Sequence, residues 1–177
     1  MIFMAGIHGA GKTTIGKKLE EKWNIRCVAA SALIEAASDQ VMPGNKVINS
    51  IEENQEFLLR EVSKLRNYGG QFILEGHFCL INGMCEIESI SLDVFEKLNP
   101  EMIVIISAHP ESIARRNKDK GLLLSNVEFV DRFQRAEIGY GEEVGRYLGV
   151  PCHIVENDEK NQDALLKEDL WRLSSYR

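Results

Sequence analysis

One octapeptide constrains this chain more than any other feature. Residues 6–13 read Gly-Ile-His-Gly-Ala-Gly-Lys-Thr and match the pattern G-x-x-x-x-G-K-[ST] at every fixed position. The apolar run Ile2–Ala5 precedes this pattern, and Lys12–Trp23 follows it with apolar residues at four-residue spacing. A glycine-rich turn between a buried strand and an amphipathic helix is the context in which the pattern binds phosphate. We therefore expect an α/β fold with a phosphate-binding loop.

The residue types in this loop explain how it would bind a nucleoside triphosphate. Glycines let the backbone turn tightly and bring N–H groups close to phosphate oxygens, and the following helix adds the positive end of its dipole. Lys12 can reach the β- and γ-phosphates, and Thr13 can offer its hydroxyl to Mg²⁺. The sequence thus predicts ATP and Mg²⁺ as cofactors. The predicted nucleotide-binding residues here are Gly6, His8, Gly9, Ala10, Gly11, Lys12, Thr13 and Thr14.

Strand and helix patterns alternate along the rest of the chain. Further strands are expected at Ile25–Ala29, Gln71–Leu74, Met102–Ser107 and Cys152–Val155. Helices are expected at Ala32–Ser38 with Ser31 as cap, Ser50–Tyr68, Leu92–Leu98, Glu111–Lys118, Asn126–Leu148 and Gln162–Leu173. We expect a loop at Met42–Asn45, a flexible stretch at Gly121–Ser125 and a hairpin turn at Asn82-Gly83. This alternation, with no repeat or linker, predicts one domain over residues 1–177, with a parallel sheet covered on both faces by helices.

Composition narrows the classes of partner. The formal net charge of −6 argues against the broad basic surface of nucleic-acid-binding proteins. No signal peptide or long apolar stretch is present, so we expect neither a membrane span nor export, but a cytoplasmic protein. The N-K-x-D pattern of GTPases is missing as well. The expected partner is a small-molecule acceptor, and the sequence does not indicate an oligomeric state.

Two features outside the loop suit phosphoryl transfer. Glu75 follows a buried strand, where an acid can organise Mg²⁺ or orient an acceptor hydroxyl; a surface carboxylate is the alternative. Arg115 and Arg116 belong to the densest cationic cluster, which could form a lid over about residues 115–126; a solvated helix face is the alternative. We predict Lys12, Glu75, Arg115 and Arg116 as catalytic residues and Thr13 and Glu75 as metal ligands.

A polar residue interrupts an apolar helix stripe. Gln55 lies four residues after Ile51 and three before Leu58, with Asn54 beside it. A buried amide needs a hydrogen-bond partner. That partner is either a backbone group or an acceptor substrate, and the sequence favours neither.

These segments together resemble the P-loop nucleoside and nucleotide kinase superfamily. The likeness is greatest to compact archaeal-type adenylate kinases and related bacterial AAA-type ATP-binding proteins, and it covers nearly the whole chain. Gly6–Thr14 is similar to the family's phosphate loop, and Leu74–His77 stands where the family has Asp-x-His. Leu98–Asp119 resembles its strand, short helix and arginine-bearing lid, and His153–Asp158 resembles its adenine-binding loop.

The resemblance implies a three-layer P-loop NTPase fold with a five-stranded parallel sheet of order 2-3-1-4-5. It implies that Arg116 contacts the transferred phosphate and that Asn157 lies near the adenine. The candidate acceptor-binding residues are Ser31, Asn54, Gln55, His77 and Gln134, the last standing where the family also carries a glutamine. This chain departs from the family in having Glu75 for Asp, His8 for Pro, and no second arginine pair in Gly121–Asn126.

The sequence therefore favours an ATP- and Mg²⁺-dependent phosphotransferase that acts on a small acceptor, a nucleoside or nucleotide. The missing lid arginines leave a second hypothesis, an ATP-binding regulatory or switch module without a small-molecule acceptor. A toxin-like kinase acting on a sugar nucleotide is a third, minor one.

Overall fold

The computed structural model describes residues 1–41 and 51–157. The predicted loop Met42–Asn45 and closing helix Gln162–Leu173 lie outside the described residues, so the single-domain organisation of the whole chain stays a prediction. The elements are β1 (Ile2–Ala5), α1 (Lys12–Trp23), β2 (Arg26–Ala29), α2 (Ala30–Val41), α3 (Ile51–Asn67), β3 (Phe72–Glu75), β4 (Cys79–Ile81), β5 (Ile87–Ser89), α4 (Leu92–Leu98), β6 (Met102–Ser107), α5 (Pro110–Arg116), the 3-10 turn η1 (Lys118–Lys120), α6 (Leu122–Ser125), α7 (Val127–Leu148) and β7 (Cys152–Glu156).

Five parallel strands form the central sheet in the order β2-β3-β1-β6-β7. With the separate β4–β5 hairpin set aside, this is the predicted order 2-3-1-4-5. Met4 of β1 lies opposite Glu75 of β3 and Val104 of β6. The carboxyl ends of β1 and β3 therefore lie at the same end of the sheet, which brings Glu75 beside the start of the phosphate loop.

Alternate residues of the strands enter two separate cores, as expected for a sheet that is covered on both faces. On one face, Phe3 and Ile103 join residues of α3, α4 and α7 in the larger core. On the other face, Met4 and Val104 pack with Ile15 and other residues of α1. Helices thus cover both faces, as predicted.

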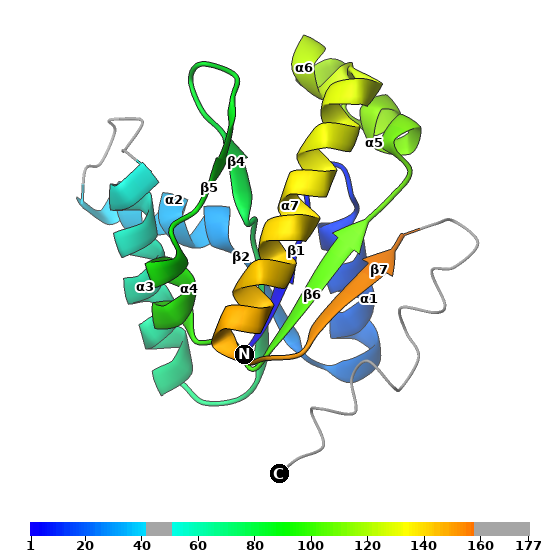
Figure 1. The fold of residues 1–177 in the computed structure, drawn as a ribbon. Helices are drawn as coiled ribbons and strands as arrows, with labels where there is room; N and C mark the ends of the chain where they lie inside the picture. The colour runs from blue at the N-terminus through cyan, green and yellow to red at the C-terminus, as the bar shows by residue number, and fades with distance from the viewer. Residues whose placement is uncertain (42–50, 158–177) are drawn as a thin grey trace.

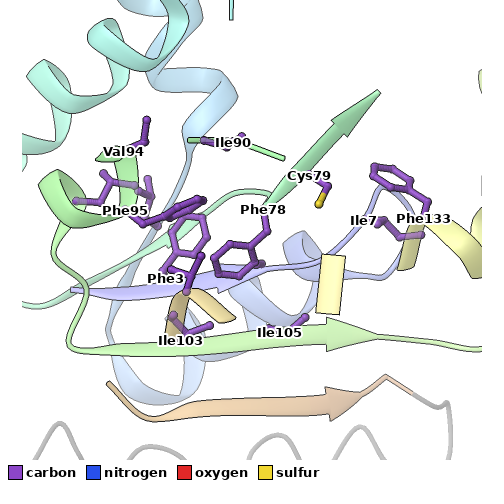
Figure 2. Close-up of a cluster of buried hydrophobic side chains, with 14 of the residues drawn as sticks. Phe3, Ile7, Phe78, Cys79, Ile90, Val94, Phe95, Ile103, Ile105 and Phe133 are labelled. Atoms are coloured by element: carbon purple, nitrogen blue, oxygen red, sulfur yellow. The ribbon is translucent and has the colours of Figure 1, made fainter. Parts of the chain in front are cut away.

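Aromatic rings fill the larger core. The ring of Phe3 lies 5.2 Å from that of Phe78 and 5.6 Å from that of Phe95, both in edge-to-face contact (Figure 2). Burying each ring contributes about 1.5–3 kcal/mol. These contacts fix the segment that follows β3 against β1 and α4.

Some element boundaries differ from the predictions. Helix α2 begins at Ala30, so Ser31 lies in its first turn and is not its cap. Helix α5 begins at Pro110, because the fixed φ of proline suits the first helical position, and it ends at Arg116. The stretch predicted to be flexible contains α6, whose Leu123 and Leu124 pack against the main core. Helix α7 is continuous and is capped by Asn126, whose side chain accepts the Phe129 N–H at 2.8 Å.

The predicted hairpin is confirmed, with a longer turn than an Asn-Gly dipeptide alone. Strands β4 and β5 pair antiparallel, from Cys79 opposite Ser89 to Ile81 opposite Ile87. The Asn82 side-chain oxygen accepts the N–H groups of Met84 and Glu86 and so closes a five-residue turn over residues 82–86. The hairpin and the α5–α6 segment both extend beyond the carboxyl ends of the sheet strands (Figure 1). Among the described helices, none combines the length and apolar character needed to cross a membrane.

Candidate phosphate-binding and acceptor site

The phosphate loop connects β1 to α1 and depends on glycine at its sharpest bend. Gly11 has a φ of 104°, in the left-handed region that side chains rarely tolerate. A β-carbon at this position would also collide with the side-chain amide of Asn157. The Ala10 N–H donates to the Ile7 carbonyl at 3.2 Å and closes the turn. The motif glycines therefore have the tight-turn role that the sequence predicts.

Side chains from outside the motif hold the carbonyl groups of the loop. Asn117, which follows α5, donates its Nδ2 to the His8 carbonyl at 2.8 Å. Asn157, which follows β7, donates its Nδ2 to the Ala10 carbonyl at 2.7 Å. Arg116 Nη1 donates to the Gly9 carbonyl at 3.0 Å. Because the N–H and C=O of a peptide point in opposite directions, these three bonds fix the orientation of the loop's peptide groups.

Lys12, Thr13 and Glu75 form a polar group beside the loop. Lys12 Nζ donates to the carbonyls of Gly6 and Ile7, the latter at 3.4 Å. Thr13 Oγ1 donates to Glu75 Oε2 at 3.2 Å. Burial raises the pKa of Glu75, while the Thr13 hydrogen bond and the Lys12 charge act in the opposite direction.

The donor atoms of this group fit a magnesium ion. Mg²⁺ prefers hard oxygen ligands, keeps several waters, and is usually held by one or two protein oxygens together with substrate phosphates. The Thr13 hydroxyl and the Glu75 carboxylate are such oxygens, already within hydrogen-bond distance of each other and next to Lys12. These two residues would hold the ion, as the sequence predicts.

A pair of histidines lies beside the loop. The rings of His8 and His77 are 4.6 Å apart and tilted by 50°. Burial lowers the pKa of His77 well below its usual value, and the nearby Lys12 and His8 lower it further. His77 is therefore neutral at physiological pH and can serve as a hydrogen-bond partner but not as a cation.

A cavity of about 580 Å³ extends from the phosphate loop into the space between the helices and the β4–β5 hairpin. We call the wall formed by the loop, the first turn of α1 and the end of α5 with the residue after it the donor half: Ile7, His8, Gly9, Gly11, Lys12, Thr13, Thr14, Arg116 and Asn117. We call the wall formed by α2, α3, the hairpin and α4 the acceptor half: Ala30, Ser31, Ile34, Asn54, Gln55, Leu58, Leu80, Ile90, Val94, Phe95 and Leu98. Phe3, Ala29, Glu75, Gly76 and His77 complete the wall.

The cavity brings together most of the residues predicted from the sequence, from both the donor and the acceptor sets. Ser31, Asn54, Gln55 and His77, the predicted acceptor residues other than Gln134, all line it. Of the predicted catalytic residues, Lys12, Glu75 and Arg116 line it as well. Segments that are distant in the sequence therefore share one space.

Five predicted residues lie outside the cavity wall. Gln134 pairs both ends of its amide with the backbone of Ala108, at 3.0 Å each. Arg115 and Arg116 are both exposed to solvent, but only Arg116 lines the cavity. Asn157, Gly6 and Ala10 belong to the framework of the loop and not to its open side.

Sequence reasoning missed two residues that hold the loop. Asn117 is fully buried and bonds the carbonyls of His8 and Ile113. Glu137 is also fully buried, and its Oε1 accepts the Gly6 N–H at 3.0 Å. One signal was available for Glu137, because it lies four residues after the buried Phe133 on the apolar stripe of α7, in the manner of Gln55 on α3.

Comparison with known proteins agrees with this architecture. Residues 5–123, well over half of the chain, match a family described as an AAA domain. The chain belongs to this AAA-domain family. Together with its sheet order and phosphate loop, that membership places it in the P-loop kinase superfamily, as the sequence predicts.

Individual relatives are distant. A provisionally assigned adenylate kinase of Pyrococcus furiosus is 23% identical over 121 residues, which cover 68% of this chain and only 56% of that protein. The chain thus matches little more than half of that relative's length.

Solved structures share the fold along their whole length. YorR of Bacillus subtilis, crystallised with phosphorylated GDP, has a TM-score of 0.58 at 16% identity, covering 98% of this chain and 95% of YorR. TT1252 of Thermus thermophilus has a TM-score of 0.54 at 17% identity, covering 99% and 97%. At such identities these likenesses support the fold alone.

Proposed function

We propose that this protein is an ATP- and Mg²⁺-dependent phosphotransferase that moves the γ-phosphate to a small acceptor, a nucleoside or a nucleotide. The observation that carries the proposal is the continuity of the cavity. One space of about 580 Å³ runs from a phosphate loop to a chamber with apolar walls, with Glu75 and His77 on the same wall. Binding two reactants in one enclosed space supplies the proximity that a transfer reaction needs.

In the donor half, the chain's own residues bind and polarise the triphosphate. The loop N–H groups contact phosphate oxygens, and Lys12 leaves the carbonyls of Gly6 and Ile7 to reach the β- and γ-phosphates. Arg116, which already touches the loop at Gly9, stabilises charge that develops on the transferred group. Mg²⁺ bound by Thr13 and Glu75 would neutralise phosphate charge.

In the acceptor half, apolar side chains bind a planar or aliphatic part of the acceptor, and a few polar groups orient it. The apolar part of the wall includes Leu58, Val94 and Phe95. The polar groups are the side-chain amides of Asn54 and Gln55 and the neutral imidazole of His77. Apolar walls with a few convergent polar groups are the usual form of a small-molecule site. A nucleobase has both characters, an apolar face and a polar edge.

A coupled ADP-release assay across nucleosides and nucleoside monophosphates tests this proposal. We expect at least one acceptor to stimulate ATP turnover well above the rate with water alone, and we expect Arg116→Ala to lower that turnover much more than Arg115→Ala does. ATP binding without acceptor-stimulated turnover would sink the proposal.

A regulatory ATP-binding switch is the second candidate, favoured by one observation on the lid. Of the basic pair Arg115 and Arg116, only Arg116 lines the cavity. A switch predicts slow ATP hydrolysis that no small acceptor stimulates and a protein partner that binds one nucleotide state. Pull-downs with ADP and with a non-hydrolysable ATP analogue separate the candidates, and partner capture that ignores the nucleotide counts against the switch.

A further inference from the structure

The fully buried carboxylate of Glu137 joins two segments that face different halves of the cavity. Its Oε1 accepts the N–H of Gly6, the first residue of the phosphate loop, at 3.0 Å. The same oxygen accepts the Phe78 N–H at 3.0 Å. Its Oε2 accepts the N–H groups of Phe78 at 2.9 Å and Cys79 at 2.7 Å. Phe78 and Cys79 lead into the β4–β5 hairpin, which supplies Leu80 to the acceptor half.

The placement of this carboxylate is energetically demanding. Burial raises the pKa of Glu137, and the N–H donors of Phe78, Cys79 and Gly6 and the nearby charge of Lys12 act against that shift. An apolar side chain at this position would leave the buried N–H groups of Gly6, Phe78 and Cys79 without this acceptor. Glu137 therefore ties backbone groups of two segments to α7.

The bonds around Gly6 form a continuous chain from the nucleotide site to the hairpin. Lys12 Nζ donates to the Gly6 carbonyl, the Gly6 N–H donates to Glu137, and the same Glu137 oxygen is shared with Phe78. Triphosphate oxygens offer the Lys12 ammonium stronger acceptors than a peptide carbonyl does. When Lys12 turns to them, the Gly6 carbonyl loses this donor, and a shift of Gly6 changes the sharing of the Glu137 oxygens.

We propose that Glu137 is a positioning residue that couples nucleotide binding at the phosphate loop to the β4–β5 hairpin. The inference rests on the nucleotide binding in the proposed function. It adds that the state of the donor half determines the position of the hairpin, which lines the acceptor half. Glu137 Oε1 accepts hydrogen bonds from both Gly6 and Phe78, so a stronger bond from one of them changes the bond from the other. Coupling of this kind is a free energy between two sites and runs in both directions.

Amide hydrogen exchange tests the coupling without knowledge of the acceptor. The full chain is measured with and without the Mg²⁺ complex of AMP-PNP, a non-hydrolysable ATP analogue. In the wild type we expect slower exchange at the loop, residues 6–14, and also at Phe78, Cys79 and the hairpin, by roughly fivefold or more. In Glu137→Gln the loop response persists and the hairpin response is lost, because an amide NH₂ faces N–H donors at one of the two oxygen positions.

Controls separate this role from a merely structural one. Glu142→Gln changes an exposed residue on the same helix and should keep the wild-type response. Glu137→Asp keeps the charge but shortens its reach, and it should show a weakened hairpin response. It also provides a second variant if Glu137→Gln does not fold, and the wild-type measurement stands alone in any case.

The outcomes distinguish the inference from the proposed function. Protection of the loop without any change in the wild-type hairpin overturns the coupling and leaves nucleotide binding intact. A hairpin response that survives in folded Glu137→Gln overturns it as well. No protection at the loop at all overturns both nucleotide binding and the coupling that rests on it.

Discussion

The two halves of the cavity are built on different principles. Three side chains from distant parts of the chain, Asn117, Glu137 and Asn157, bond three different residues of the phosphate loop. In the acceptor half, Gln55 Oε1 is buried and has no hydrogen-bond partner within the described residues, and His77 Nδ1 beside it has none either. The Oδ1 atoms of Asn117 and Asn157 are unpaired as well, although the Nδ2 atoms of both side chains donate to the loop. The contrast between the halves lies in the bonded atoms. Three side chains already hold the donor half, whereas the buried oxygen of Gln55 in the acceptor half has no partner among the described residues.

The strongest test of the donor half removes its positive charge. For Lys12→Ala we expect kcat for ATP turnover to fall roughly 100- to 1,000-fold, the usual loss when one charge-stabilising donor is removed from a reacting group. Lys17→Ala, at an exposed position of the same helix, is the matched control and should stay close to the wild-type rate. Steady-state kinetics and AMP-PNP titration measure both. A Lys12→Ala protein with near-normal turnover would contradict the assignment of this loop.

We expect a second, smaller effect for Glu75→Gln, which should lower activity and raise stability. For Glu75→Gln we expect turnover to fall about 10- to 100-fold, as for other groups that support a metal. Burial raises the pKa of Glu75 above its ordinary value of 4.5, so the folded state holds this proton more tightly than the unfolded state does. The ionised carboxylate therefore costs stability at neutral pH, and that cost disappears as the pH falls through the raised pKa towards 4.5.

The pH dependence of stability tests this account of Glu75. Glu75→Gln should raise Tm at pH 7, and the gain should shrink as the pH is lowered towards 4.5, where Glu75 is protonated in both states. Thermal melts of both proteins without Mg²⁺ across this pH range measure the trend. A lower Tm for Glu75→Gln at pH 7 would show that bonds to Glu75, including the one from Thr13, outweigh its burial.

Local patterns predicted most of the fold, and packing decided the rest. Met102–Ser107 was located correctly because a strand buried on both faces is a continuous apolar run. Gly141 lies in the interior of α7, where glycine is a poor helix former, yet the helix is continuous there. A β-carbon on Gly141 would lie 2.6 Å from the Ile105 side chain and 2.7 Å from that of Phe78, so the glycine lets α7 approach the sheet. Tertiary packing overrides helix propensity at this position.

The same contrast holds for the site. The loop residues are contiguous, and their spacing alone identifies them. Asn117 and Glu137 reach the loop across more than 100 residues of sequence, through hydrogen bonds that no local pattern encodes. The family resemblance pointed to Gln134, but the residue one helical turn further on contacts the loop. A polar residue on an apolar stripe was the signal that found Gln55, and it applied to Glu137 as well.

An apolar substitution of the same kind in each half sharpens the comparison. Asn117→Leu removes the side-chain donor to the His8 carbonyl, while the Ile113 carbonyl keeps its bond from the backbone N–H of residue 117. We expect the free energy of unfolding to fall by about 1–3 kcal/mol and the affinity for AMP-PNP to fall with it. Asn67→Leu, at an exposed position of α3, is the control. Urea unfolding and calorimetric titration measure the two effects, and full stability in Asn117→Leu would show that the loop holds its shape without this anchor.

Gln55→Leu should have the smallest effect on stability. Its Oε1 is already buried without a partner among the described residues. An apolar side chain of similar size therefore removes an unpaired acceptor and should cost little stability. We expect the free energy of unfolding to stay within about 1 kcal/mol of the wild type, with AMP-PNP affinity unchanged. If the acceptor is the missing partner of this amide, its KM should rise about tenfold, the equivalent of one hydrogen bond. A marked loss of stability in Gln55→Leu, with no change in the acceptor KM, would instead make Gln55 a structural residue and remove the contrast between the two halves.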